Sequence, residues 1–198
     1  MEKPRRVEVV LDFMCVHSYR GFSRFTRVTR RFRADGGQVE TVYCPFQLQP
    51  EASSAGEPLF EVWKRQRGEE VARALVSDES FGVAGGLELN FGRAWFTNTF
   101  DAHRIHAQAS AQGRGEQMAE RLFRAYFTDG LNIADPDTLT RIASETGVVT
   151  SETGAAGLRA ELERVRRFGV QPPAFRFEGG PVLEGEQSEE LFLTTLMR

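Results

Sequence analysis

The stretch LDFMCVHSYRG, residues 11–21, decides how the rest of the chain is interpreted. It ends an apolar run, places a cysteine at the joint, and opens a segment in which apolar residues recur every three or four positions. That change of spacing predicts a buried strand followed directly by a helix. Cys15 would then lie at the helix N-terminus. The position three residues later, where a second cysteine would complete a redox pair, holds Ser18.

On either side of this joint the sequence predicts a β-α-β unit. Residues 6–13 form the first strand, and the helical pattern continues until Gly36 and Gly37 end it. Residues 38–46 predict a second strand, which Pro45 limits to a sheet edge or a strand end. Because the connections are tight, we expect the two strands to be parallel.

The remaining sequence predicts a block of helices and then a return to strands. Helices are expected over residues 57–77, 98–111, 116–126, 136–146 and 151–168, with an irregular glycine-rich stretch at 81–92. Residues 174–177 and 181–184 predict a hairpin, and Ser188 can cap a last helix. This order predicts one α/β sheet domain, residues 1–50 and 163–198, interrupted by a helical domain over residues 51–162.

Composition and charge exclude several classes of function. The 198 residues are 40% hydrophobic with a net charge of −3, so nothing favours nucleic-acid binding or attachment to a membrane surface. No apolar run approaches the roughly 18 residues of a membrane span, and the N-terminal residues lack the pattern of a secretory signal. We therefore expect a cytoplasmic protein with reduced thiols. With three histidines and no Cys-x-x-Cys pair, we expect no metal; without a glycine-rich fingerprint, we expect no dinucleotide.

Four motifs in this order resemble the DsbA-type thioredoxin-fold family. They are DFMCVHS at 12–18, PFQLQP at 45–50, NTFDAHR at 98–104 with LFRAYF at 122–127, and GVQPPAF at 169–175. The similarity is greatest to the FrnE-like branch, which also resembles 2-hydroxychromene-2-carboxylate isomerases and kappa-class glutathione transferases. The resemblance implies a thioredoxin-like fold with a large inserted helical domain. It also implies that Cys15 faces a cis-proline loop.

Cys15 is the candidate nucleophile. Unpaired N–H groups and the dipole at a helix N-terminus favour a thiolate, and His17 would add to this, so we predict a lowered pKa. Ser18 can donate a hydrogen bond to the sulfur but cannot resolve a mixed disulfide. Cys44 is open to two interpretations: a remote resolving thiol, or a residue packed between strand and helix. A bridge would need Cα atoms within about 7 Å.

The resemblance also supplies candidate substrate contacts. It puts Pro173 at the cis-proline position after Pro172, which has no N–H to donate to a peptide substrate. If Pro172 is the cis residue instead, that argument fails. The full set of substrate-binding candidates is Phe13, Met14, Tyr19, Asn98, His103, Pro172 and Pro173. The resemblance places Asn98 and His103 at the cleft between the two halves; a plain surface histidine is the alternative.

Together these features predict nucleophilic chemistry on a small molecule. The predicted function is a cofactor-free, cysteine-dependent isomerase: the thiolate adds to a conjugated substrate, the former double bond rotates, and elimination releases the other isomer. Cys15 would be the nucleophile, His17 the proton carrier and Ser18 the stabiliser of the thiolate. The FrnE-like resemblance implies a polyketide-type substrate of natural-product biosynthesis, free or bound to a carrier protein, and a homodimer.

Two alternatives stay open. One is a monothiol disulfide oxidoreductase that uses glutathione, and the other is a non-catalytic thioredoxin-fold binding module. A stripe of arginines on the first helix could dock an acidic carrier, or it could pair locally with acidic side chains. The stripe consists of Arg20, Arg24, Arg27 and Arg31.

Overall fold

The computed structural model describes residues 3–78, 82 and 86–198. The predicted unit is present as β1 (Arg5–Leu11), α1 (Val16–Ala34) and β2 (Val39–Pro45), and β1 pairs in parallel with β2. Pro45 is the last residue of β2, which lies at one edge of the sheet. A missing N–H at this point removes no bond between two strands, which is why proline is tolerated there.

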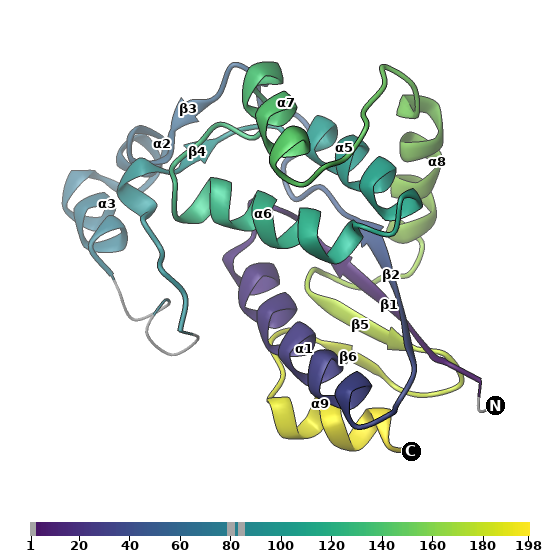
Figure 1. Cartoon of the computed structure of the whole chain (residues 1–198). Helices are drawn as coiled ribbons and strands as arrows, with labels where there is room; N and C mark the ends of the chain where they lie inside the picture. The colour runs from purple at the N-terminus through teal and green to yellow at the C-terminus, as the bar shows by residue number, and fades with distance from the viewer. Residues whose placement is uncertain (1–2, 79–81, 83–85) are drawn as a thin grey trace.

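The central sheet has four strands in the order β2-β1-β5-β6 (Figure 1). β5 (Ala174–Phe177) pairs antiparallel with β1, and the predicted hairpin joins it to β6 (Val182–Glu184). The last helix, α9 (Glu189–Leu196), begins at Ser188, whose hydroxyl accepts a hydrogen bond from the Leu191 N–H. Segments from the two ends of the chain therefore form one sheet.

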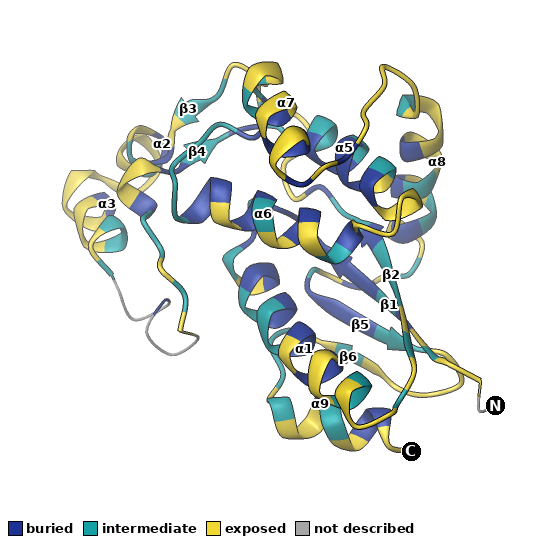
Figure 2. Ribbon diagram, viewed as in Figure 1, coloured by how far each residue is buried: buried dark blue, intermediate teal, exposed yellow. Residues whose placement is uncertain are grey.

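Alternation along the strands divides the core between the two faces of the sheet. Val9 and Leu11 of β1 pack with the phenylalanines of α1 and α9, whereas Val10 packs with Cys44 and with Val165 of α8 (Ala155–Arg166). Figure 2 shows the buried residues on the inner surfaces of these layers. Each fully buried large apolar side chain contributes roughly 1.5–3 kcal/mol. The sheet thus separates α1 and α9 from α8.

Between β2 and β5 the chain is mostly helical. α5 (Phe100–Ala111), α6 (Gly115–Phe127) and α7 (Pro136–Glu145) correspond to predicted helices, and Asp135 caps α7 with Pro136 at its first position. Among the described residues, no helix is long and apolar enough to cross a membrane. The domain boundaries at residues 50 and 162 stay a prediction.

The single helix predicted over residues 57–77 is wrong. The segment contains β3 (Glu57–Pro58), α2 (Leu59–Arg67) and α3 (Glu69–Val76), and Gly68 interrupts the helix with a φ of 88°. β3 pairs with β4 (Trp95–Phe96), which follows the short helix η1 (Phe91–Arg93). A positive φ of this size favours glycine, and local periodicity does not reveal such a break. Most of the stretch predicted to be irregular, 81–92, lies outside the described residues or in the turn before η1.

Candidate active site

Cys15 is the N-cap residue of α1. Its sulfur accepts a hydrogen bond from the Ser18 N–H, with 3.4 Å between Sγ and N, and its thiol points at the Pro172 carbonyl, 3.9 Å from the oxygen. Cys15 is only 7% exposed. The helix N-terminus and the proline loop therefore hold the sulfur between them, as the sequence resemblance implied.

The prediction of a lowered pKa for Cys15 is wrong for this resting arrangement. Burial raises the pKa of the thiol, because the thiolate loses its solvation, and the negative charge of Asp12 raises it further. The hydrogen bonds from Ser18 lower the pKa but do not offset burial. The motif identified the helix N-terminus but not the depth of the sulfur. The group at rest near neutral pH is the thiol, so a nucleophilic step needs a base.

The raised pKa of Cys15 predicts how its alkylation depends on pH. In a Cys44→Ala background, labelling by iodoacetamide should be half-maximal above about pH 8.5, the ordinary value for a cysteine. Ser18→Ala should move the midpoint higher still, because the Ser18 side chain is one of the groups that lower the pKa. Intact mass measured against pH gives both midpoints. Half-maximal labelling below pH 7 would contradict the structure.

Asp12 anchors the loop that carries the cysteine. The carboxylate is fully buried and accepts a hydrogen bond from the Leu48 N–H at 2.7 Å and from the Met14 N–H at 3.5 Å. The Asp12 N–H in turn donates to the Ser18 hydroxyl at 3.3 Å. The end of β1, the cysteine loop and the loop after β2 are therefore fixed to one another.

The proline loop closes the other side of the site. The peptide bond between Pro172 and Pro173 is cis, so Pro173 is the cis residue and Pro172 precedes it. The Pro173 carbonyl accepts a hydrogen bond from the Gly185 N–H at 2.7 Å. Pro172 presents a carbonyl to Cys15 and has no N–H with which to bind an extended peptide.

Cys44 lies on the opposite face of the sheet. It is fully buried with Val10, Val165 and Ala174, in the layer covered by α8, and the Arg164 guanidinium donates to its sulfur at 3.5 Å. Burial raises the pKa of Cys44 to about 12. Both cysteines are free thiols. Packing between strand and helix is therefore the interpretation that the structure supports.

A pocket of about 330 Å³ opens beside the cysteine loop. Met14 and Val16, the two neighbours of Cys15, line it, and most of the other lining residues come from α2, η1 and the end of α6. Its lining is mainly apolar and aromatic, including Leu59, Trp63, Phe91 and Phe127, with Gln49, Gln66 and Arg67 as polar members. This size and lining are typical of a site for a small apolar molecule.

Several aromatic residues line the pocket. Trp63, Phe91 and Phe96 come from the part of the chain between β2 and α5. Tyr126 and Phe127 also line it, at the end of the helix that carries the LFRAYF motif. Sequence spacing could not distinguish these two from ordinary core residues of α6.

Three of the predicted substrate contacts pack against other side chains. Phe13 is fully buried against His103, with ring centroids 4.7 Å apart, and Tyr19 stacks on Phe123. His103 is 1% exposed, and its Nε2 lies 2.9 Å from the Phe46 carbonyl oxygen. None of these side chains lines the pocket beside Cys15. The substrate contacts of Phe13, Tyr19 and His103 stay predictions, whereas the alternative of a surface histidine is wrong because His103 is buried.

Asn98 stabilises the loop after β2 through hydrogen bonds. Its amide nitrogen donates to the Pro50 and Ala52 carbonyls, and its oxygen accepts from the Phe100 N–H and from Gln47. These bonds use the hydrogen-bonding capacity of the amide. The substrate contact of Asn98 stays a prediction.

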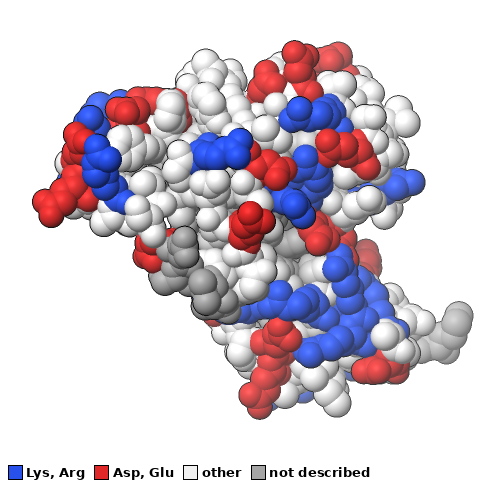
Figure 3. Space-filling model, turned by 60° about the vertical axis from the view of Figure 1, so that its left-hand side comes forward, with Lys and Arg blue, Asp and Glu red and all other residues white. Residues whose placement is uncertain are grey.

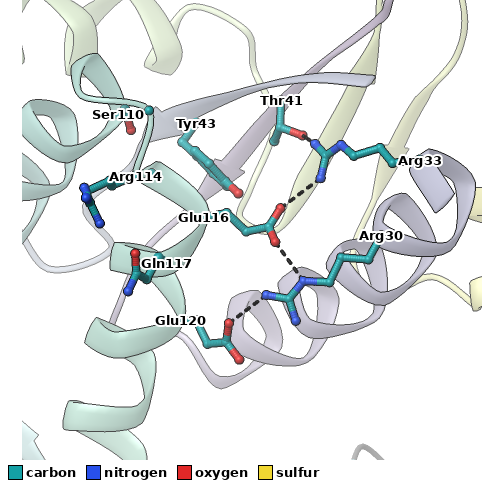
Figure 4. A pocket seen from close by; sticks show the side chains of 11 residues that line it. Arg30, Arg33, Thr41, Tyr43, Ser110, Arg114, Glu116, Gln117 and Glu120 are labelled. Atoms are coloured by element: carbon teal, nitrogen blue, oxygen red, sulfur yellow. Dashed lines mark hydrogen bonds and ion pairs between the residues drawn. The ribbon is translucent and has the colours of Figure 1, made fainter. Parts of the chain in front are cut away.

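A larger cavity, about 500 Å³, lies between α1, β2 and α6 and is lined by charges that satisfy one another (Figure 4). Arg30 and Arg33 both bind Glu116, at 2.8 and 3.1 Å, and Arg30 also binds Glu120 at 2.9 Å. These pairs connect α1 to α6. They contain no nucleophile and explain the cavity as a polar junction between the helical segment and the sheet domain.

The arginine stripe of α1 is paired locally. Figure 3 shows basic side chains gathered on the lower part of the molecule, with acidic ones beside them. The pairs join α1 to the segment around the start of α9: Arg20 and Arg24 with Glu186, and Arg27 and Arg31 with Glu189. Among the described residues, no group of three or more His, Cys, Asp or Glu side chains could hold a metal ion.

A cysteine that caps a helix opposite a cis-proline loop, on this sheet order, defines the thioredoxin-like class. The family model of the DSBA-like thioredoxin domain matches residues 6–169. The chain belongs to this family and has the predicted thioredoxin-like fold.

Three solved structures show the range of that fold. A probable DsbA oxidoreductase from Streptomyces coelicolor is 25% identical with a TM-score of 0.84, covering 98% of this chain and 88% of that one. A 2-hydroxychromene-2-carboxylate isomerase is 13% identical, with a TM-score of 0.65 and coverages of 96% and 92%. The cytosolic disulfide reductase DsbM from Pseudomonas aeruginosa, with glutathione, is 18% identical, with a TM-score of 0.55 and coverages of 90% and 89%. The last two show likeness of fold alone.

Proposed function

We propose that this protein is a cofactor-free, cysteine-dependent isomerase of a small conjugated substrate. The observation that carries the proposal is one thiol beside an apolar pocket, with serine at the resolving position and the second cysteine on the other face of the sheet. Such a thiol can form and release a covalent adduct but cannot store a disulfide within its motif.

The proposed reaction involves no net oxidation. The Cys15 proton passes to a base, a C–S bond forms at the β-carbon of a conjugated ketone, and the carbon–carbon π electrons move into an enolate. Rotation about the resulting single bond follows. The electron pair then returns, the C–S bond breaks, the double bond forms in the trans geometry, and Cys15 regains its proton.

The pocket supports this choice of substrate. Its aromatic walls favour a planar apolar body, and Arg67 and Gln66 can bind a polar end. Pro172 lacks the N–H that would bind an extended polypeptide in the added-strand mode. A carrier-bound substrate, a cytoplasmic location and a homodimer stay predictions.

A glutathione-linked disulfide oxidoreductase is the second candidate. It is supported by the similarity to the probable DsbA oxidoreductase and to the disulfide reductase DsbM, whose structure contains glutathione. Glutathione from solution could resolve a mixed disulfide at Cys15 without a second protein thiol. Turnover that requires glutathione would support this candidate over the isomerase.

A non-catalytic binding module is the third candidate function. The raised pKa of Cys15 favours it, because an unactivated thiol does not react readily. The two catalytic candidates both require a base that removes the proton when substrate is bound. The module requires none, so it predicts an inert thiol in every assay.

The isomerisation of cis-benzylideneacetone, followed by absorbance, is expected to separate these functions. Wild-type protein and Cys44→Ala should accelerate conversion to the trans ketone by at least about 100-fold over buffer, the lower range for general acid–base catalysis. Cys15→Ala should be inactive. Equal rates for wild type and Cys15→Ala would contradict the proposal.

A further inference from the structure

A series of contacts leads from Cys15 to Glu186, a residue that belongs to none of the sequence motifs. The Cys15 thiol points at the Pro172 carbonyl, and the next carbonyl, of Pro173, accepts the Gly185 N–H. Gly185 is followed by Glu186, whose Oε1 lies 2.7 Å from Nδ1 of His17. Glu186 is therefore brought to the site by the loop between β6 and α9, 169 residues from His17 along the chain.

Glu186 is held in place from two sides. Its Oε1 faces His17, while Oε2 lies 3.1 Å from Nε of Arg20 and 3.4 Å from Nη1 of Arg24. The Glu186 side chain is 15% exposed and that of His17 is 56% exposed. The carboxylate is therefore largely enclosed and faces two arginines, whereas the imidazole is more exposed to solvent.

We propose that Glu186 is a positioning residue, which keeps the Nδ1–H tautomer of His17 and so makes Nε2 the basic nitrogen of the ring. This inference rests on the proposed function, in which His17 carries the proton of Cys15. A carboxylate that accepts from one ring nitrogen fixes the tautomer and orientation of the other. Arg20 and Arg24 then have a role beyond surface pairing, because they hold Glu186 in this position.

The proposed reaction needs a base close to Cys15. The enclosed thiol must lose its proton when substrate binds, and His17 lies two residues after it on the first turn of α1. The charged groups around the pair are Glu186, Arg20 and Arg24 on the His17 side and Asp12 on the Cys15 side. A neutral imidazole with a fixed basic Nε2 can accept the proton and return it in the elimination step.

The tautomer can be measured without a substrate. In protein labelled with ¹⁵N-histidine, two-bond correlation spectra near pH 8.5 distinguish the nitrogen that carries hydrogen in each of the three histidines. His17 should show a protonated Nδ1 in the wild type. In Glu186→Gln the ring should shift toward the Nε2–H form or to a mixture of the two.

The kinetic arm uses the benzylideneacetone assay. Glu186→Gln should lower kcat by about tenfold or more with KM within about twofold, since the residue acts on proton transfer and not on binding. Glu186→Asp should recover part of kcat. The matched control is Glu189→Gln, which removes the carboxylate that pairs with the other two arginines of the stripe. It should change neither the tautomer nor kcat.

A wild-type His17 with its hydrogen on Nε2, or a tautomer unchanged in Glu186→Gln, would overturn the inference. An equal loss of kcat in Glu189→Gln would also overturn it. The loss in both variants would then come from breaking ion pairs between α1 and the start of α9, and not from the tautomer of His17. If wild-type protein fails to isomerise the ketone, the proposed function fails; the spectra still decide whether Glu186 fixes His17.

Discussion

Replacing Ser18 with cysteine is expected to give the chain a disulfide within its motif, which the wild-type chain does not form. Ser18 is fully buried on the first turn of α1, and its N–H already contacts the Cys15 sulfur. Cysteine is close to serine in size, so the fold should accept the change. On oxidation, Ser18→Cys should lose the mass of two hydrogens and should then catalyse reduction of insulin by dithiothreitol.

The wild-type chain and Ser18→Ala are the controls, and both should keep their mass under the same oxidant. No disulfide is expected within the wild-type chain, because the sheet separates the two native cysteines. A wild-type disulfide between Cys15 and Cys44 within one chain would contradict the structural separation. Insulin reduction by the wild type equal to that by Ser18→Cys would contradict the role given to Ser18.

Acid is expected to destabilise the protein through His106. The side chain is 4% exposed, packs edge-on against Phe13 and Tyr43, and has its Nε2 3.0 Å from the Gly115 carbonyl oxygen. Burial lowers the pKa of His106 from 6.5 to about 3. The unfolded chain therefore binds the proton first as the pH falls, and the free energy of unfolding decreases. The loss is about 1.4 kcal/mol for each pH unit below 6.5, or roughly 3 kcal/mol by pH 4.5.

The contribution of His106 can be isolated with His106→Gln. The glutamine amide can still donate to the Gly115 carbonyl but does not titrate. The variant should be less stable than the wild type at pH 7, because packing against two aromatic rings is lost. Its denaturant-derived free energy of unfolding should fall less steeply between pH 6.5 and 4.5. Carboxylates titrate in both proteins and cancel in the difference. Parallel slopes for the two proteins would contradict this assignment.

Most of the fold could be predicted because its signals are local. The change from strand to helix spacing at Cys15, the end of α1 before Gly36, and the Asp-Pro start of α7 each lie within a few residues. The parallel pairing of β1 with β2 followed from their short connection, and the family resemblance placed the cysteine opposite the proline loop. The interruption at Gly68 was missed because a positive φ leaves no mark on hydrophobic periodicity.

The site was harder to predict because its properties depend on depth and on distant contacts. The motif indicates a helix N-terminus for Cys15, but the burial that raises its pKa comes from the assembled loops. Phe13 and Asn98 matched family motifs, yet one packs into the core and the other braces a loop. Glu186 reaches His17 only through the return of the chain to the sheet after β6, and no local signal could identify it.

The most direct test of reversible addition at Cys15 is a competition between the conjugated ketone and oxidised glutathione. Cys44→Ala protein is incubated with cis-benzylideneacetone over a range of oxidised glutathione concentrations, and product isomers and intact mass are followed together. The account predicts conversion to the trans ketone at a rate independent of glutathione, with no stable mixed disulfide. A mixed disulfide on Cys15 that reduced glutathione removes, with no isomerisation of the ketone, would contradict it and assign the site to disulfide exchange.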